Sequence, residues 1–191
     1  MRYFGFRWDR KALRGQLERA VRDLPASPHK VRFTGSRRGQ IRMTTERLSE
    51  KAARRPEDAP ETPWSLALAE TPVSSDDVFL FHKTTHRRVY DEARAAHPDV
   101  DEVILVNERG ELTEGTRFNL VLELEGELVT PPVASGLLGG VFRQRLLRDG
   151  AIRERVLRPA DLDRAETIWL VNSVRGFRRG RRIVDKDENF R

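Results

Sequence analysis

The chain has 191 residues, a length that suits one ordinary domain or two small ones. It contains no cysteine, which excludes disulfides and thiolate metal sites and fits a reducing compartment. The net charge is +6, with 36 basic and 30 acidic residues, and because acids are interspersed among the arginines we expect a solvated basic surface rather than a nucleic-acid groove.

The N-terminus alternates aromatic and charged residues and lacks the apolar core of a signal peptide. No later apolar run is long enough to span a bilayer. The sequence therefore predicts a cytoplasmic protein with neither a membrane nor a nucleic acid as its partner. A small anionic substrate would be attracted by the basic field.

A helix and a hairpin are expected in the first fifty residues. Residues 9–24 carry leucine and valine at helical spacing, with Asp9 as a suitable N-cap. Residues 30–34 and 40–44 predict two strands joined by the turn GSRRG.

Residues 49–63 lose this apolar periodicity, contain several prolines and predict a mobile loop. A strand is expected at 64–69, and a crossing segment rich in turn residues follows it. We place a domain boundary in this crossing, so that residues 1–78 form a smaller N-terminal domain and residues 79–191 a larger one.

The sequence of the larger domain predicts an antiparallel meander with flanking helices. Short apolar runs separated by turns such as NERG predict strands at 103–106, 111–113, 118–124 and 128–130. A helix is expected at 86–96, a second helix begins near Gly140, and a buried strand is expected at 166–171.

The apolar residues 79–81 are expected to form a buried strand. Lys83 lies at the junction of this strand and the first of these helices, a position that would aim its amine inward from a dry wall. Burial disfavours the ammonium form and so favours the free amine, which can form a Schiff base with an aldehyde. A lysine considered alone is better interpreted as a surface residue whose charge reaches water. Lysines are scarce in this chain, however, and the residues described next favour the Schiff-base interpretation over the surface one.

Glu114 lies at a corner between two expected strands and is followed by Gly115 and Thr116. A carboxylate at such a corner can point into a pocket and keep a pyridine nitrogen protonated. Considered alone, Glu114 is better interpreted as an exposed glutamate at a strand end.

Gly139 and Gly140 come just before a predicted helix, where free backbone N–H groups bind phosphate well. Ser173, at the end of the last expected strand, could add a hydroxyl donor. Each feature is weak alone, because a plain turn explains it. Together, an amine, a carboxylate and a phosphate loop are what a pyridoxal 5′-phosphate (PLP) pocket requires.

Taken together, these residues resemble the class IV aminotransferase family, the fold-type IV PLP enzymes. The resemblance rests on a composite motif: Glu114-Gly-Thr-Arg-Phe-Asn119-Leu120, then Leu128-Val-Thr130, then Leu138-Gly-Gly140-Val141-Phe-Arg143. One departure is Val121, where the family usually has an aromatic residue. The resemblance implies an α+β fold with an incomplete small N-terminal α/β domain and a larger domain that has a mostly antiparallel sheet or barrel and flanking helices.

The resemblance also implies roles for single residues. Lys83 would be the catalytic Schiff-base lysine, and Glu114 would be the partner of the pyridine nitrogen. Further cofactor contacts are expected from Asn119, Gly140, Val141, Phe142 and Ser173. The arginines chemically suited to an anionic substrate are Arg87, Arg117 and Arg175, and no metal site is expected.

Within the family, the segments HKTTHRRVYDEA, TPPVASGLLGGVFR and WLVNSVRG are most similar to the aminodeoxychorismate lyases, including the lyase-like half of fused aminodeoxychorismate synthases. This similarity implies a PLP-dependent lyase that releases pyruvate and 4-aminobenzoate, a folate precursor. The family implies a homodimer, and the fusions suggest an aminodeoxychorismate synthase as a partner.

Two alternatives stay open. A class IV aminotransferase acting on branched-chain or D-amino acids would share the cofactor residues and differ in its substrate wall. Family members also begin with further small-domain strands that usually supply an arginine to the cofactor phosphate, so a truncated, non-catalytic remnant is the other hypothesis. Arg2 and Arg7 lie near the start of this chain, but nothing in the sequence assigns them that role.

Overall fold

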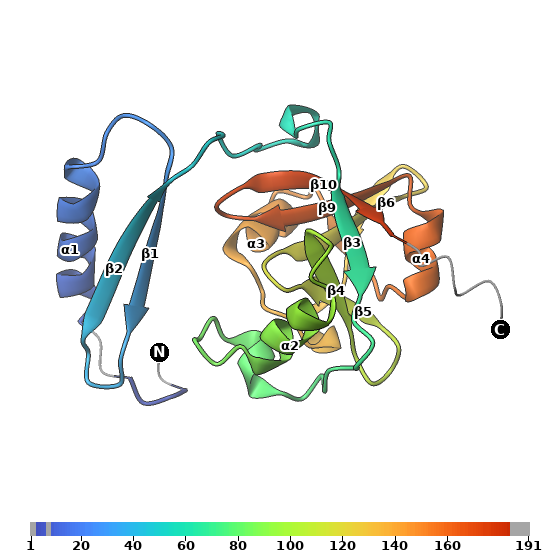
Figure 1. The fold of residues 1–191 in the computed structure, drawn as a ribbon, viewed down its shortest axis with the longest axis horizontal. Coiled ribbons are helices and arrows are strands. Elements are labelled where there is room, and N and C mark those ends of the chain that lie inside the picture. Colours follow the sequence, from blue (N-terminus) through green and yellow to red (C-terminus); the bar gives the residue numbers. More distant parts are fainter. Residues whose placement is uncertain (1–2, 7–8, 184–191) are drawn as a thin grey trace. The chain divides into compact units, whose positions relative to one another are not determined.

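The computed structural model describes residues 3–6 and 9–183 (Figure 1). The chain divides into two compact units, Met1–Lys51 and Ala52–Arg191, and each is described by itself. Arg2 and Arg7 lie outside the described residues. Within the described part, no helix combines the length and the apolar character needed to cross a membrane.

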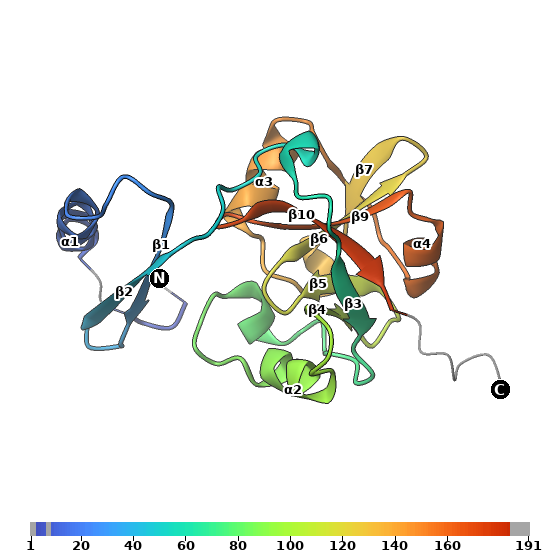
Figure 2. The same cartoon turned by 45° about the horizontal axis from the view of Figure 1, so that its top comes forward.

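The first unit is a helix with a two-stranded antiparallel ribbon (Figure 2). Helix α1 spans Arg10–Arg22, and the Asp9 carboxylate accepts hydrogen bonds from two N–H groups of its first turn. Strand β1 spans His29–Gly35 and strand β2 spans Ile41–Arg47. The predicted helix and hairpin are confirmed. No described residue of this unit is buried, so its apolar side chains are only partly covered.

The second unit is built on an eight-stranded sheet in the order β5-β4-β3-β10-β9-β6-β7-β8. An additional pairing of β5 with β6 closes the sheet on itself. Most neighbours are antiparallel, and the parallel pairs are β3 with β4, β3 with β10, and β7 with β8. The strands span Trp64–Leu68 (β3), Glu102–Val106 (β4), Leu112–Gly115 (β5), Asn119–Leu124 (β6), Glu127–Thr130 (β7), Arg153–Glu154 (β8), Thr167–Asn172 (β9) and Gly176–Arg182 (β10).

Helices flank this sheet, and η denotes a 3-10 helix. They span Pro56–Asp58 (η1), Val78–Phe81 (η2), Arg88–Ala96 (α2), Val133–Ser135 (η3), Val141–Arg148 (α3) and Pro159–Arg164 (α4). The expected α+β class, with a mostly antiparallel, barrel-like sheet and flanking helices, is confirmed.

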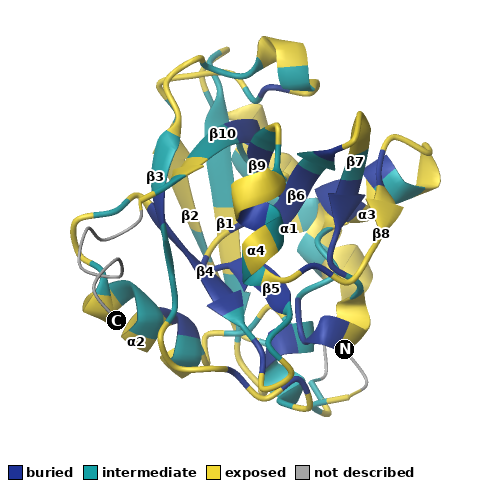
Figure 3. Cartoon of the chain, turned by 90° about the vertical axis from the view of Figure 1, so that its right-hand side faces the viewer, coloured by how far each residue is buried: buried dark blue, intermediate teal, exposed yellow. Residues whose placement is uncertain are grey.

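Strand β6 is buried on both faces, which explains its nearly continuous apolar sequence (Figure 3). Leu120 and Leu122 belong to one apolar cluster, which also contains residues of β3, β4, β5 and β9. Val121 points to a second cluster, where it is grouped with Trp169 of β9 and Phe142 of α3. The second cluster therefore fixes the start of α3 against the sheet.

Three features differ from the sequence-based expectations. Residues 79–81 belong to η2 instead of a buried strand, because the segment forms a short turn capped by Asp77. The chain divides after residue 51, whereas the expected boundary follows residue 78; the difference arises because β3 pairs with β4 and β10 inside the second unit. The expected loop 49–63 contains η1 and a bridge between Ala53 and Gly176, and its mobility stays a prediction.

Candidate active site

A cavity of about 270 Å³ in the second unit gathers most of the predicted site residues. Its wall comes from the loop between η2 and α2, the β5–β6 corner, the loop before α3 and the turn after β9. The wall includes every predicted cofactor residue: Lys83, Glu114, Asn119, Gly140, Val141, Phe142 and Ser173. The fold thus brings together residues that are far apart in the sequence.

Lys83 reaches the cavity from the loop that follows η2, and it is exposed. The expectation of a lysine buried in a dry wall is wrong, because η2 ends at Phe81 and leaves Lys83 in an open loop. The chain then turns towards α2, where the His86 N–H group donates a hydrogen bond to Thr84 Oγ1 at 3.1 Å. Lys83 is near enough to Glu114 for its charge to lower the pKa of that carboxyl.

Glu114 lies within β5, and only 5% of its surface is exposed. Its Oε1 accepts hydrogen bonds from Tyr90 Oη at 2.8 Å and from the Leu138 N–H group at 3.0 Å. Its Oε2 accepts a hydrogen bond from Asn119 Nδ2 at 3.0 Å. Burial raises the pKa of Glu114 to about 7, although these hydrogen bonds and nearby positive charges oppose the shift. The carboxyl can therefore exchange a proton near neutral pH.

Asn119 connects Glu114 to the glycine-rich loop before α3. The two residues are paired across β5 and β6, and Asn119 Nδ2 also donates to Leu138 O at 2.8 Å. A Cβ atom on Gly140 would overlap Asn119 Oδ1. The loop can therefore approach β6 this closely only because residue 140 has no side chain.

The N-terminus of α3 opens at the cavity wall. Its N-cap residue is Gly140, so no side chain caps the N–H groups of the first turn. The N–H groups of Val141 and Phe142 lie at the positive end of the helix dipole, where they suit an anion. The Phe142 ring packs edge-to-face against Phe177, with 5.6 Å between the ring centroids.

Ser173 lies in the tight turn that joins β9 to β10. Asn172 Oδ1 accepts hydrogen bonds from the N–H groups of Val174 at 3.0 Å and Arg175 at 2.8 Å, which fixes the turn. Asn172, Ser173 and Val174 all line the cavity. The turn thus brings the Ser173 hydroxyl to the same cavity as the start of α3.

Two of the three predicted substrate arginines, Arg87 and Arg117, line the cavity. Arg87 Nη2 donates a hydrogen bond to Thr116 O at 2.6 Å. Arg175 is not among the described residues of the cavity wall, and its guanidinium lies 5.8 Å from the centroid of the Trp64 ring. A role for Arg175 in substrate binding therefore has no support from its position.

The corner after Glu114 is held by Glu102, a fully buried carboxylate on β4. Glu102 Oε1 accepts hydrogen bonds from the Thr116 N–H group at 2.9 Å and from the Thr116 hydroxyl. Its Oε2 accepts a hydrogen bond from Arg117 Nε at 3.3 Å. These contacts fix the backbone beside the cavity.

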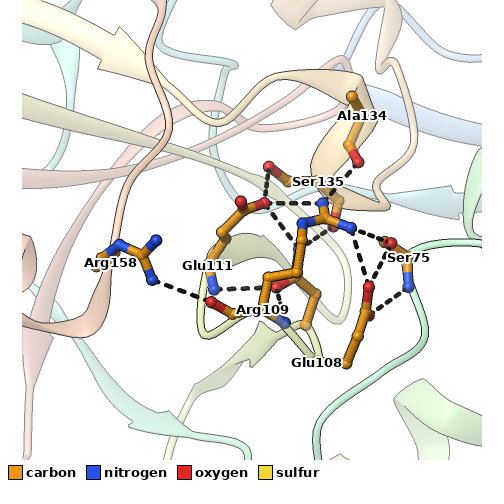
Figure 4. A network of polar contacts seen from close by, with 8 residues as sticks. Ser75, Glu108, Arg109, Glu111, Ala134, Ser135 and Arg158 are labelled. Carbon is orange, nitrogen blue, oxygen red and sulfur yellow. Dashed lines mark hydrogen bonds and ion pairs between the residues drawn. The ribbon is translucent and has the colours of Figure 1, made fainter.

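A polar network holds η3, the segment before the glycine-rich loop (Figure 4). Glu111 Oε2 accepts hydrogen bonds from Ser135 Oγ at 2.9 Å and from Arg109 Nη2 at 2.8 Å. Asn107 Nδ2 donates to the same carboxylate oxygen and to Ser135 O, each at 2.9 Å. The Arg109 hydrogen bond, followed by that of Asn107, lowers the pKa of Glu111 to about 2.

Sequence reasoning missed Tyr90 and Glu102, which hold Glu114 and the adjoining corner. The available signal was a polar group within an apolar pattern, because a buried hydroxyl or carboxylate needs hydrogen-bond partners. Tyr90 lies beside Val89 in the predicted helix, and Glu102 opens the run EVILV. Among the residues that the structure describes, no group of three or more His, Cys, Asp or Glu side chains could hold a metal ion.

The sequence matches the family "Amino-transferase class IV" over residues 1–183. A Schizosaccharomyces pombe protein named "Putative aminodeoxychorismate lyase" is 29% identical over 195 residues, which cover 96% of this chain and 79% of that protein. The crystal structure of a "Putative amino-acid aminotransferase" from Mesorhizobium loti is 32% identical, with a TM-score of 0.84 over 94% of this chain and 84% of that chain.

A "hypothetical aminotransferase" from Mycobacterium tuberculosis, solved with alpha-ketoglutarate and PMP bound, shares the fold. It is 24% identical, with a TM-score of 0.70 over 90% of this chain and 65% of that chain. Because the family match spans nearly the whole sequence, the chain belongs to the class IV aminotransferase family.

Proposed function

We propose that this chain binds PLP in the cavity and acts as a lyase that converts aminodeoxychorismate into pyruvate and 4-aminobenzoate. The observation that carries the cofactor assignment is the meeting of an amine, a buried carboxylate and a helix N-terminus in one cavity of about 270 Å³. That volume is close to the lower end of the range for small-molecule sites, ~300 Å³. Similarity to the Schizosaccharomyces pombe protein supports the choice of reaction.

The donor and acceptor groups of the cavity fit the three polar parts of PLP. Lys83 offers an amine for the aldehyde. Glu114 Oε2 accepts one hydrogen bond from Asn119 and keeps capacity for a second, from a protonated pyridine nitrogen. The first-turn N–H groups of α3 and the Ser173 hydroxyl suit the phosphate.

PLP supplies a ring that withdraws the negative charge that develops beside the substrate amine. Glu114 serves this chemistry as an anion, and a positively charged neighbour favours its ionised form. Lys83 Nζ, in the cavity wall, can accept the proton leaving the substrate carbon and return it later.

The lyase reaction needs no second substrate. Pyruvate and 4-aminobenzoate together contain all the atoms of aminodeoxychorismate, so neither an amino acceptor nor an oxidant is required. The substrate carries carboxylate groups, and guanidinium groups bind carboxylates well. Arg87 and Arg117, which line the cavity, are the proposed partners of these groups.

An aminotransferase acting on branched-chain or D-amino acids is the second candidate. It is favoured by the 32% identity to the Mesorhizobium loti protein, whose name specifies an amino-acid aminotransferase. Such an enzyme would use Lys83 and Glu114 in the same roles. It would differ in requiring a 2-oxo acid to receive the amino group.

The first test is a visible absorbance spectrum of the protein after incubation with PLP and desalting. We expect the wild type to retain a long-wavelength band that borohydride abolishes, and Lys83→Ala to lack it. Lys51→Ala, at an exposed lysine of the first unit, is the matched control and should retain the band. A wild type without the band would contradict the cofactor assignment and favour the non-catalytic hypothesis.

Product analysis of the PLP-loaded protein separates the two enzyme candidates. Release of pyruvate and 4-aminobenzoate from aminodeoxychorismate, without an added 2-oxo acid, is expected for the lyase. Turnover of amino acids that depends on an added 2-oxo acid would favour the aminotransferase. The homodimer and the synthase partner stay predictions, and light scattering and co-purification test them.

A further inference from the structure

Arg54 lies next to the cavity wall in a segment whose backbone is fixed. The preceding residue, Ala53, donates its N–H group to Arg175 O at 3.1 Å and accepts a hydrogen bond from the Phe177 N–H group at 2.9 Å. Gly176, between these partners, has a φ of 70°, and a Cβ atom there would overlap Ala53 O. The bridge therefore requires glycine at 176 and holds Arg54 at the turn after β9.

The Arg54 side chain contacts two residues of the cavity wall. Its Nη1 donates a hydrogen bond to Ser173 O at 3.4 Å, and its Cζ lies 5.7 Å from the centroid of the Phe142 ring. Ser173 belongs to the turn after β9, and Phe142 belongs to the first turn of α3. The guanidinium thus contacts one residue from each of the two segments assigned to the phosphate.

The Arg54 guanidinium keeps most of its donors available. An arginine has five N–H donors, and the bond to Ser173 O uses one of them. No carboxylate of the described residues forms an ion pair with Arg54, whereas the adjacent Arg55 pairs with Glu57 at 3.8 Å. Arg87 and Arg117, in the cavity wall, pair with Asp91 at 3.8 Å and with Glu102 at 3.3 Å.

We infer that Arg54 binds the phosphate of PLP together with the first turn of α3 and Ser173. This inference rests on the proposed function. A phosphate monoester carries a charge of about −1.5 to −2 near neutral pH, and a planar guanidinium can bind two of its oxygens at once. The helix N-terminus supplies a partial positive charge of about half a unit, so Arg54 provides the full cation at this end of the site.

The test compares PLP with pyridoxal, which has the same aldehyde and ring but no phosphate. Each is titrated into the wild type, Arg54→Ala and Arg55→Ala, and binding is followed by the absorbance of the lysine-linked ligand. Arg55 is the matched control, because it is an exposed arginine next in the chain that pairs with Glu57. Circular dichroism spectra verify that all three proteins are folded.

We expect Arg54→Ala to raise the Kd for PLP about tenfold, the size of one charge-assisted hydrogen bond, and to leave the Kd for pyridoxal unchanged. Arg55→Ala should change neither. Equal PLP binding by Arg54→Ala and the wild type would overturn the assignment of Arg54 while leaving the cofactor proposal intact. A parallel loss of PLP and pyridoxal would also overturn it, and absence of PLP binding by the wild type would overturn both proposals.

Discussion

Glu114 makes the stability of this protein depend on pH. Its pKa is raised by burial from 4.5 to about 7, so between these values the folded protein holds a proton that the unfolded chain has released. The free energy of unfolding therefore falls as the pH rises through this window. The difference in pKa corresponds to about 3 kcal/mol at most, because one pKa unit is about 1.4 kcal/mol.

Glu114→Gln should remove this decline, since the amide does not titrate. Urea unfolding of the wild type and the variant is measured without PLP at several pH values between about 4.5 and about 8. It gives, for each protein, the slope of the free energy of unfolding against pH. We expect the wild type to lose stability relative to the variant as the pH rises. Parallel slopes would mean that Glu114 is already ionised throughout this range in the folded protein.

Tyr90 lowers the pKa of Glu114, because its hydroxyl donates to the carboxylate at 2.8 Å. Tyr90→Phe keeps the ring packed against Leu80 and Leu105 and removes only this donor. We therefore expect the Glu114 pKa to rise further above 7 in the variant. The amide signal of Leu138, whose N–H group donates to Glu114, should report the titration by NMR. An unchanged midpoint in Tyr90→Phe would argue against this role.

The short helix η3 is held in place mainly by side chains of other segments. It has three residues, and Glu111 anchors it through Ser135 while Arg109 donates to Ala134 O at 2.9 Å. Glu111 is ionised in the network because Arg109 and Asn107 donate to it. The network thus fixes the chain just before the loop that carries Leu138 to Glu114.

Glu111→Gln should lower the free energy of unfolding by about 1.5–3 kcal/mol near neutral pH, the range for hydrogen bonds to a charged group. The folded-state pKa of about 2 lies below the ordinary 4.5, so this stabilisation is present above about pH 4.5 and is lost as the pH falls through 2. The variant and the wild type should therefore converge in acid. Glu57→Gln, at an exposed 3.8 Å ion pair, is the control and should lower the free energy of unfolding much less.

Periodicity predicted the elements whose partners lie nearby in sequence. The antiparallel strands β4 to β7 and helix α3 follow from apolar runs, turns and a glycine pair. Strand β10 could not be predicted in this way, because its sequence GFRRGRR has no apolar alternation. It forms a strand because it pairs with β3 on one side and β9 on the other, which is a tertiary effect.

In the site, too, the features that depend on tertiary contacts could not be predicted from the sequence. The types and spacing of Lys83, Glu114 and the glycine pair predicted a shared pocket, and all of them line one cavity. Their surroundings did not follow from spacing. The exposure of Lys83, the Tyr90 contact to Glu114 and the position of Arg54 depend on how a loop, a helix face and a bridge fold against the sheet.

At the scale of the whole molecule, the two units differ in how much core they possess. The second unit contains three clusters of buried apolar residues around a closed sheet. The first unit contains no buried residue among those the structure describes, and its sheet is a single two-stranded ribbon. An isolated ribbon of this kind has marginal stability in water. The second unit therefore carries most of the stabilisation of the fold.

Hydrogen exchange should reveal this difference. Amides of β1 and β2 should exchange through low-energy local opening, whereas those of β6 and β9, which lie in the core, should exchange only through opening that approaches global unfolding. Mass spectrometry of peptides from His29–Gly35 and Asn119–Leu124 gives a direct comparison under one set of conditions. Equal protection would mean either that a second copy of the chain covers the ribbon in solution or that the ribbon is intrinsically stable. Dilution would then separate the causes, because protection by a second copy of the chain falls with protein concentration and intrinsic stability does not.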